Sequence, residues 1–346
     1  MLAVDGTTLT APDTPENQAA FPQQKGQRPG CGFPILRLVA FFALATGMIT
    51  GWIHGAYGQS ELALLQLLWE ELRPGELLLG DRGFCTWGLL AQCQARHVHA
   101  VFRVRGSRRR DFRRGQRLSR DERAVRWAKP TQPPKTITAE EWARLPDSLD
   151  LRLVRCRVNV RGFRSRQVIL VTTLLDRDAY PAQALAELYL RRWEMELMLR
   201  HLKVTLQMDH LSCKTPDNLA REIRLHLLVH NLVRRVMLEA ARRHHAPLSR
   251  LSFAGALAAC RRCGEALLQA RSQRQRQELL DALFRGIAAD LLPDRPGRRE
   301  PRALKRRPKP HPLLTRHRSK FKEIKHQNRY YKNSPYGGQY PKSSRR

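Results

Sequence analysis

Four side chains of different chemistry recur at fixed intervals in the segment YLRRWEMELMLRHLK, which begins at position 189. They are Tyr189, Arg192, Glu196 and Lys203, with the spacing Y-x2-R-x3-E-x6-K. An α-helix turns about 100° per residue, which places all four within about 60° of one another along roughly 20 Å. A carboxylate among cations and a hydroxyl can hold Mg²⁺ beside phosphate groups. For this helix taken alone, a solvated face with ordinary i,i+4 ion pairs is the alternative.

The same helical geometry places Arg200 and Trp193 beside the stripe. A separate arc of apolar residues should pack on a sheet, because an amphipathic helix buries one face. That arc consists of Leu188, Met195, Leu199, Leu202 and Leu206.

Two further carboxylates follow apolar stretches that read as strands. Asp5 comes after a short opening strand, and Asp81 ends the strand at 77–79. The carboxyl ends of central strands are where α/β sheets carry their sites. Asp5, Asp81 and Glu196 would together supply three hard oxygen ligands for Mg²⁺ in phosphoryl transfer. Taken singly, each Asp could instead form a turn beside a glycine.

The elements that must position these residues alternate between strands and helices. The apolar run over 35–53 contains Thr46-Gly47 at its middle, which predicts two buried strands and a tight turn rather than a membrane helix. The Arg-rich segment 106–150 reads as an inserted, solvent-facing stretch. Further strands are predicted over 97–105, 149–160 and 163–176, and helices over 60–72, 86–96, 181–207, 216–243, 250–262 and 266–291. The pattern indicates an α/β fold.

The net charge of +32, with 63 Lys and Arg against 31 acidic residues, predicts a polyanionic partner. Nucleic acid is the first expectation and an anionic membrane surface the second. The seven cysteines are scattered and odd in number, which favours a reducing cytosol over a disulfide framework. Cys260 and Cys263 form one C-x-x-C without the second pair that a zinc site needs.

The motifs resemble those of the DDE transposases of bacterial insertion sequences, of the insertion-sequence-4 type. That family is recognised by Y-x2-R-x3-E-x6-K, which this chain meets in full. AVDGTTLTAPDTPEN is similar to the block with the first catalytic Asp, and LLLGDRGF to the block with the second. The resemblance implies that Asp5, Asp81 and Glu196 are the catalytic and metal-binding residues. It covers roughly residues 1–255.

The resemblance also implies the fold. We expect a ribonuclease-H-like mixed sheet flanked by helices, with a β-rich insertion between the second catalytic Asp and the catalytic Glu. The expected division is a catalytic core over 1–105 and 166–258, a basic insertion over 106–165, a helical segment over 259–294 and a basic, disordered tail over 295–346.

The implied reaction is DNA cleavage at transposon ends followed by strand transfer, with Mg²⁺ as cofactor and Mn²⁺ as its substitute. The implied partners are transposon ends and target DNA, bound by a homodimer in the bacterial cytoplasm at the nucleoid, without a membrane. Tyr189, Arg192 and Lys203 would hold phosphates near the cleaved end, with Arg200 and Trp193 beside them; for Trp193, packing is the safer expectation.

Two other functions remain open. One is a nuclease or resolvase of related fold that cleaves DNA without joining it, and the other is a basic DNA-binding protein without catalysis. Only four residues precede Asp5, where members of the family carry a DNA-binding domain. We therefore expect either a truncated, inactive copy or a start that lies upstream.

Overall fold

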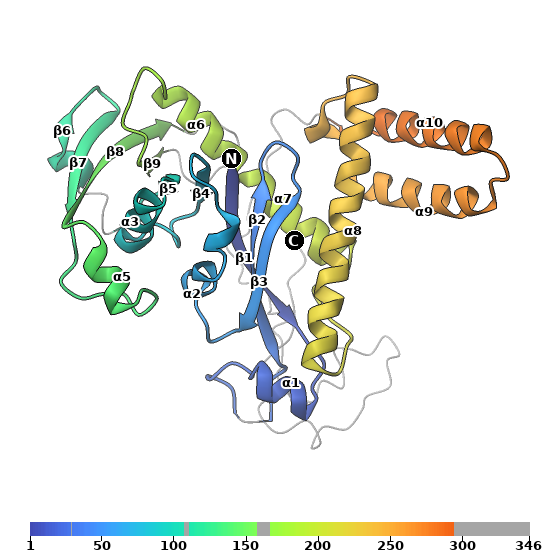
Figure 1. The fold of residues 1–346 in the computed structure, drawn as a ribbon, viewed down its shortest axis with the longest axis horizontal. Coiled ribbons are helices and arrows are strands. Elements are labelled where there is room, and N and C mark those ends of the chain that lie inside the picture. The colour runs from blue at the N-terminus through green and yellow to red at the C-terminus, as the bar shows by residue number, and fades with distance from the viewer. Residues whose placement is uncertain (29, 107–110, 158–166, 294–346) are drawn as a thin grey trace, which may run out of the picture.

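The computed structural model of the chain describes residues 1–28, 30–106, 111–157 and 167–293, and one nine-stranded sheet runs through it (Figure 1). The strand order is β3-β2-β1-β4-β5-β9-β8-β7-β6. The strands are β1 (Leu2–Thr10), β2 (Ile35–Ala43), β3 (Ile49–Ala56), β4 (Leu77–Gly80), β5 (His99–Arg103), β6 (Gln116–Arg117), β7 (Glu122–Ala128), β8 (Ser148–Arg157) and β9 (Gln167–Thr172).

Helices cover both faces of the sheet (Figure 1). The α-helices are α1 (Pro15–Ala20), α2 (Glu61–Gln66), α3 (Trp87–Ala95), α4 (Asp111–Arg114), α5 (Ala139–Arg144), α6 (Ala182–Arg191), α7 (Trp193–Arg200), α8 (Pro216–Arg243), α9 (Phe253–Gln269) and α10 (Gln273–Ala289). Short 3₁₀ turns lie at Trp69–Glu71 and Leu248–Arg250, and a π-helical turn, η3, at His201–Thr205. The predicted mixed α/β architecture is thereby confirmed.

The centre of the sheet is parallel and both flanks are antiparallel. β1 pairs in parallel with β4, and β4 with β5, whereas β1, β2 and β3 form an antiparallel meander. The two strands and tight turn predicted over 35–53 are confirmed. Gly47 occupies the turn with φ +70°, a conformation that costs glycine no steric strain. Within the described residues, no helix is long and apolar enough to span a bilayer.

Alternating side chains of the central strands enter two separate cores, as the two-residue period of a strand requires. In β1, Leu2 and Val4 pack with α2, α3 and α5, on what we call the α3 face. Ala3 and Leu9 pack with α6, α7 and α8, on what we call the α8 face. The position of any residue in β1 therefore decides which group of helices it meets.

The segment over 106–150 is less exposed than the sequence predicts. β7 and β8 extend the main sheet, and apolar residues such as Val125 and Trp127 lie beside the arginines of β7. Trp127, Trp142 and Leu149 are buried on the α3 face. The predicted turn at 161–162 and the tail over 295–346 lie outside the described residues.

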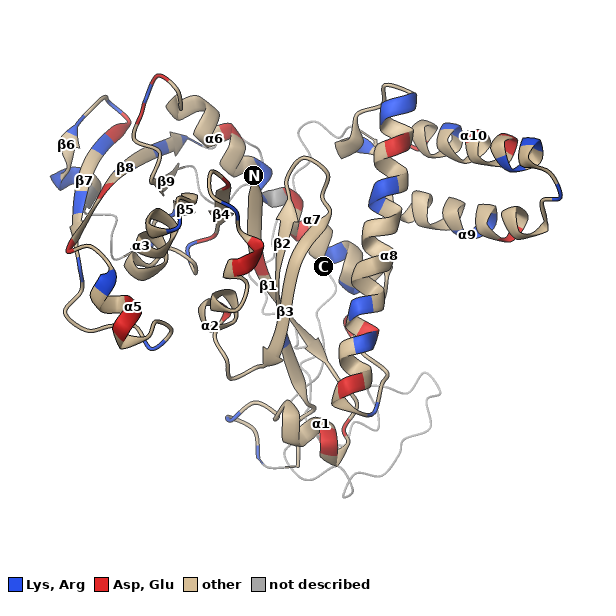
Figure 2. Ribbon diagram, in the orientation of Figure 1, with Lys and Arg blue, Asp and Glu red and all other residues tan. Residues whose placement is uncertain are grey.

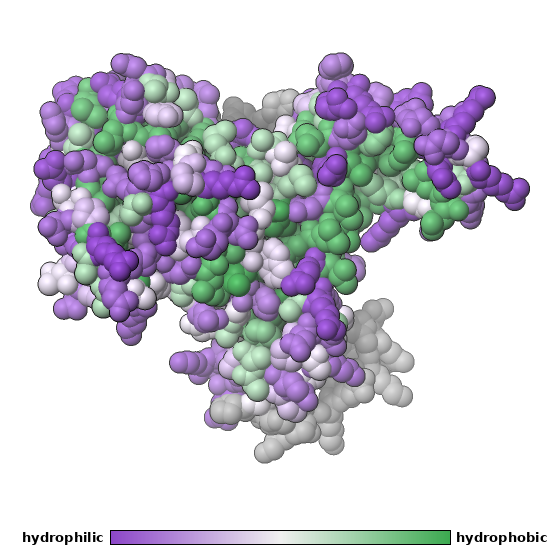
Figure 3. Space-filling view, viewed as in Figure 1, coloured by the Kyte–Doolittle hydropathy of each residue, from purple (hydrophilic) through white to green (hydrophobic). Residues whose placement is uncertain are grey.

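Helix α8 confirms the prediction over 216–243 and is tied to the β2–β3 turn. Asn231 bonds both the N–H and the C=O of Ile49, at 2.8 Å each, and Arg234 donates to the carbonyl of Thr46. A stripe of apolar residues on α8 remains at the surface, where Figure 3 shows hydrophobic colouring. The exposed residues of the stripe are Leu225, Leu228, Val229 and Leu232.

Candidate active site

The strand register places Asp5 and Asp81 side by side. Leu2 pairs with Leu78 and Ala3 with Leu79 in the parallel β1–β4 ladder, so continuing it by two residues brings Asp5 level with Asp81. Adjacent strands lie about 4.8 Å apart. The predicted end of the first strand at Asp5 is wrong, because β1 continues to Thr10 through its pairing with β2. Asp81 does follow the end of its strand, as predicted.

The carboxylate of Asp5 faces the helices of the α8 face, since it shares the alternation of Ala3. It accepts a hydrogen bond from the N–H of Gly6 at 2.9 Å. Burial raises the pKa of Asp5 to about 6. The bond from Gly6 and the charge of Arg192 lower it, while Asp81 and Glu61 raise it further. Asp5 is thus a partly buried acid whose pKa is raised further by the neighbouring charges of Asp81 and Glu61.

A fixed loop holds Asp81. Its Oδ1 accepts from the N–H of Gly83 at 2.6 Å. Arg105, just beyond β5, donates to the carbonyls of Arg82 at 3.0 Å and Gly83 at 2.6 Å. These bonds close the Asp-Arg-Gly turn, which the sequence motif GDRGF already indicates by its glycine.

Tyr189 and Arg192 cover the two aspartates from the α8 face. Tyr189 is buried at the end of α6, and the guanidinium of Arg192 lies 5.7 Å from the centre of its ring. Burial disfavours the charged form of Arg192, but its negative neighbours, Asp5 and Asp81 among them, raise its pKa overall. The charges of Asp5 and Asp81 thus favour the charged form of Arg192. Tyr189 is buried and does not lie on a solvent-facing stripe.

Arg103 is a further cation that the sequence reasoning missed. It ends β5, and the β4–β5 register places it level with Asp81. Its charge lowers the pKa of Tyr189, which burial raises. The signal was available, because a charged residue at the end of an alternating central strand lies at the same sheet edge as the site.

The helix that carries the motif is broken, which corrects the predicted continuous stripe. Arg192 N–H bonds to the carbonyl of Tyr189 and Met195 N–H to that of Arg192, both three residues back, so α6 and α7 meet in a tight turn. After Arg200 the chain makes a π-helical turn, with Leu206 N–H bonded five residues back. The regular 100° step therefore does not hold between the first and last motif residues.

Glu196 and Lys203 have partners of their own as a result. Glu196 is 44% exposed and forms an ion pair with Arg192 at 3.5 Å. Lys203 pairs with Asp209 at 2.8 Å and donates to the carbonyl of Thr8 in β1 at 3.1 Å. Lys203 thus lies further along β1 from Asp5, by roughly 10 Å of strand.

The remaining residues predicted on the motif helix are Arg200, Trp193 and the apolar arc. Arg200 is exposed at the end of α7. The side chain of Trp193 lies outside the part of the chain that the structure describes. The apolar arc is confirmed, because Met195, Leu202 and Leu206 are buried and Leu188 and Leu199 pack against the same core.

The chemistry of these donors suits a divalent cation, but their present spacing does not. The charge of Asp81 raises the pKa of the partly buried Asp5, and hard cations favour such carboxylate oxygens. Among the described residues, however, no three His, Cys, Asp or Glu side chains are grouped as a ready metal centre. Glu196 would have to leave its ion pair with Arg192 to join the two aspartates.

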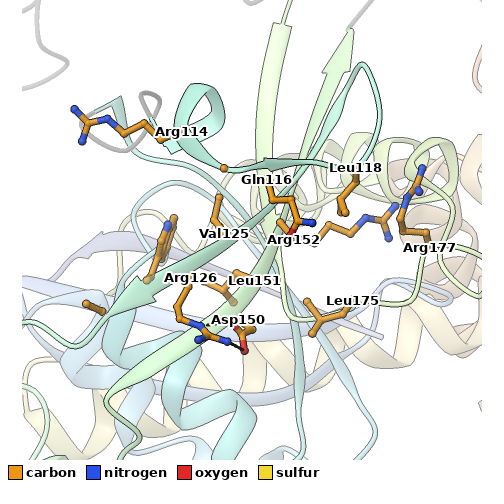
Figure 4. Close-up of a pocket in the computed structure, with 14 residues that line it drawn as sticks. Arg114, Gln116, Leu118, Val125, Arg126, Asp150, Leu151, Arg152, Leu175 and Arg177 are labelled. Atoms are coloured by element: carbon orange, nitrogen blue, oxygen red, sulfur yellow. Dashed lines mark hydrogen bonds and ion pairs between the residues drawn. The ribbon is translucent and has the colours of Figure 1, made fainter.

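A separate hollow of about 720 Å³ lies over β7 and β8, and none of the predicted site residues lines it. Figure 4 shows Val125, Leu151 and Leu175 lining it, with arginines around them. One of these, Arg126, is held by Asp150 at 2.7 Å. The candidate catalytic residues Asp5 and Asp81, in β1 and at the end of β4, therefore lie outside this hollow.

The family model described as Transposase DDE domain matches residues 1–232. The chain belongs to the DDE transposase family. It is 29% identical over 321 residues to the transposase InsG of insertion sequence element IS4 from Escherichia coli strain K12, which covers 90% of this chain and 69% of that protein. The resemblance to the insertion-sequence-4 type is thus confirmed.

Among solved structures, this DDE transposase chain is similar to piggyBac transposase in a cryo-EM synaptic complex with hairpin DNA. The identity is 9% and the TM-score 0.43, over 85% of this chain. The chain spans 57% of the length of that transposase chain.

Proposed function

We propose that this chain cleaves DNA at transposon ends and joins the freed end to target DNA, with Asp5, Asp81 and Glu196 as the catalytic acids. Its membership of the DDE transposases supports the reaction class. The observation that carries the assignment of residues is the parallel register that brings Asp5 level with Asp81, beneath the helix that bears Glu196.

We also propose that the core is ribonuclease-H-like. The order β3-β2-β1-β4-β5, with an antiparallel meander leading into parallel strands, supports this proposal. β6 to β8 lie between the second Asp and the motif helix, as expected of an insertion.

The residues present would divide the work by charge. Asp5, Asp81 and Glu196 would hold Mg²⁺ or Mn²⁺, which when bound supplies positive charge to the attacking and leaving oxygens. Arg192, whose charged form both aspartates favour, would hold a phosphate of the cleaved strand. Lys203 would hold the DNA backbone at a point further along β1.

DNA as the partner is supported by the net charge of +32. Figure 2 shows basic residues at intervals along α8 and on α9 and α10. We expect binding to weaken steeply with added salt, because each phosphate contact releases counterions.

A cleavage and strand-transfer assay on DNA with the flanking terminal sequences tests the proposal. Asp5→Asn, Asp81→Asn and Glu196→Gln should each abolish cleavage while DNA binding is kept. Glu194→Gln is the matched control on the same helix, because Glu194 pairs with Arg191 at 3.3 Å and should retain activity.

The other outcomes decide between the remaining functions. Cleavage without joining would assign a nuclease, and unchanged DNA function in all three variants would assign a non-catalytic binding protein. Sedimentation of the chain with and without end DNA would test the homodimer that we propose to form on DNA.

A further inference from the structure

Glu61 reaches the site from the opposite face of the sheet. It is the first residue of α2, which packs on the α3 face, whereas Tyr189 and Arg192 cover the α8 face. A Cβ on Gly6 would lie only 2.6 Å from Glu61 Oε1, which is closer than real Cβ contacts. Since Gly6 has no side chain, the carboxylate of Glu61 occupies that space on the α3 face, at the residue next to Asp5 in β1.

Local sequence fixes this direction of the side chain. The Oγ of Ser60 caps α2 by accepting from the N–H of Ala63 at 3.1 Å. Leu64 and Leu65, three and four residues after Glu61, are buried against the sheet. Residues at these intervals share one helix face, so Glu61 points toward the sheet with them.

The carboxylate of Glu61 also shares the electrostatic environment of the aspartates. Its charge raises the pKa of Asp5. Burial raises the pKa of Glu61 itself, and the charge of Asp81 adds to this effect. Arg37 on β2 lowers it, but no hydrogen bond or ion pair joins Glu61 to another residue in the described ranges. A half-buried carboxylate without such a partner costs free energy that a bound cation would recover.

We propose that Glu61 is a further cation-binding carboxylate of the site, entering beside Gly6 to act with Asp5 and Asp81. The inference rests on the proposed function, because it adds a residue to the same metal site. Glu196 approaches from the α8 face and Glu61 from the α3 face, so a cation near the two aspartates would be held from both sides of the sheet.

Calorimetric titration of the purified full chain with Mn²⁺ tests this without an activity assay. Glu61→Gln should weaken Mn²⁺ binding tenfold or more, in the range typical for groups that support a metal. Gly6→Ala should do the same, because the added Cβ displaces the Glu61 carboxylate. Glu70→Gln is the control, since Glu70 is exposed on the neighbouring 3₁₀ turn and should bind as the parent does.

Thermal unfolding of each variant in metal-free buffer checks that the fold is intact; if Gly6→Ala does not fold, Glu61→Gln alone decides. Parent-like Mn²⁺ affinity in Glu61→Gln, with binding lost in Asp5→Asn, would overturn the role of Glu61 and leave the proposed function standing. Unchanged binding in Asp5→Asn and Asp81→Asn would instead overturn the proposed site.

Discussion

Lowering the pH from 8 to 5 should destabilise the folded chain through two histidines next to the motif helix, His201 and His230. His201 begins the π-helical turn after α7, and its ring stacks on Phe253 with centroids 4.4 Å apart. The His230 ring, fully buried on α8, lies 5.3 Å from the same Phe253 ring. Nδ1 of His201 and Nε2 of His230 are buried without a hydrogen-bond partner, so neither ring is prepared to carry a charge.

The sign of the effect follows from the two pKa values. Burial, with the nearby Arg234, lowers the pKa of His230 to about 3 and that of His201 to about 4, although Asn231 opposes this at His230. The unfolded chain takes up both protons below about pH 6.5, while the folded chain does not. The contribution of these two neutral histidines to the unfolding free energy is therefore fully present above pH 6.5 and is lost as the pH falls toward 4.

The size of the effect at pH 5 is about 2 kcal/mol for each histidine. A pH of 5 lies about 1.5 units below the ordinary histidine pKa of the unfolded chain. Each of these units favours the unfolded state by about 1.4 kcal/mol. Together the pair should cost about 4 kcal/mol of unfolding free energy, a large share of the stability of an ordinary domain.

Urea unfolding followed by tryptophan fluorescence at pH 8, 6.5 and 5 measures this. The parent should lose about 4 kcal/mol more than the double variant His201→Gln, His230→Gln over that range. His244→Gln, at an exposed position, is the control and should follow the parent. Carboxylates elsewhere titrate alike in all variants and cancel. Parallel pH curves for parent and double variant would refute the reasoning.

Four further substitutions test the scaffold by the same urea measurement. Glu122→Gln should cost about 3–5 kcal/mol, because it leaves the buried guanidinium of Arg152 without its counter-charge, whereas Asp150→Asn in an exposed, solvent-screened pair should leave the unfolding midpoint almost unchanged. Equal losses in the two variants would contradict this. Asn231→Ala should cost about 2 kcal/mol by removing two bonds to the backbone of β3, and an unchanged midpoint would show the tie to be dispensable. Gly47→Ala should cost about 1–2 kcal/mol at φ +70°, and a stabilised variant would argue against that turn geometry.

The sequence by itself determined the elements whose signals are local. Strand alternation and turn residues located β2 and β3 on either side of Gly47, and a helical period after Pro216 located α8. The spacing of Tyr189 to Lys203, with the two Asp blocks, was enough to identify the family. These features depend on residues within a few positions of each other, so one chain carries them in full.

Only the tertiary structure decided how the carboxylates meet. The alignment of Asp5 beside Asp81 depends on the register of two strands that are distant in the chain, and no local pattern encodes that register. The breaks on either side of α7 interrupt the regular helical step between Tyr189 and Lys203, because hydrogen bonds three and five residues back replace those four residues back. Glu61 approaches Gly6, the residue after Asp5, only because α2 packs on the sheet. Its charge then acts on Asp5, because electrostatic interactions depend on distance in space and not on separation along the sequence.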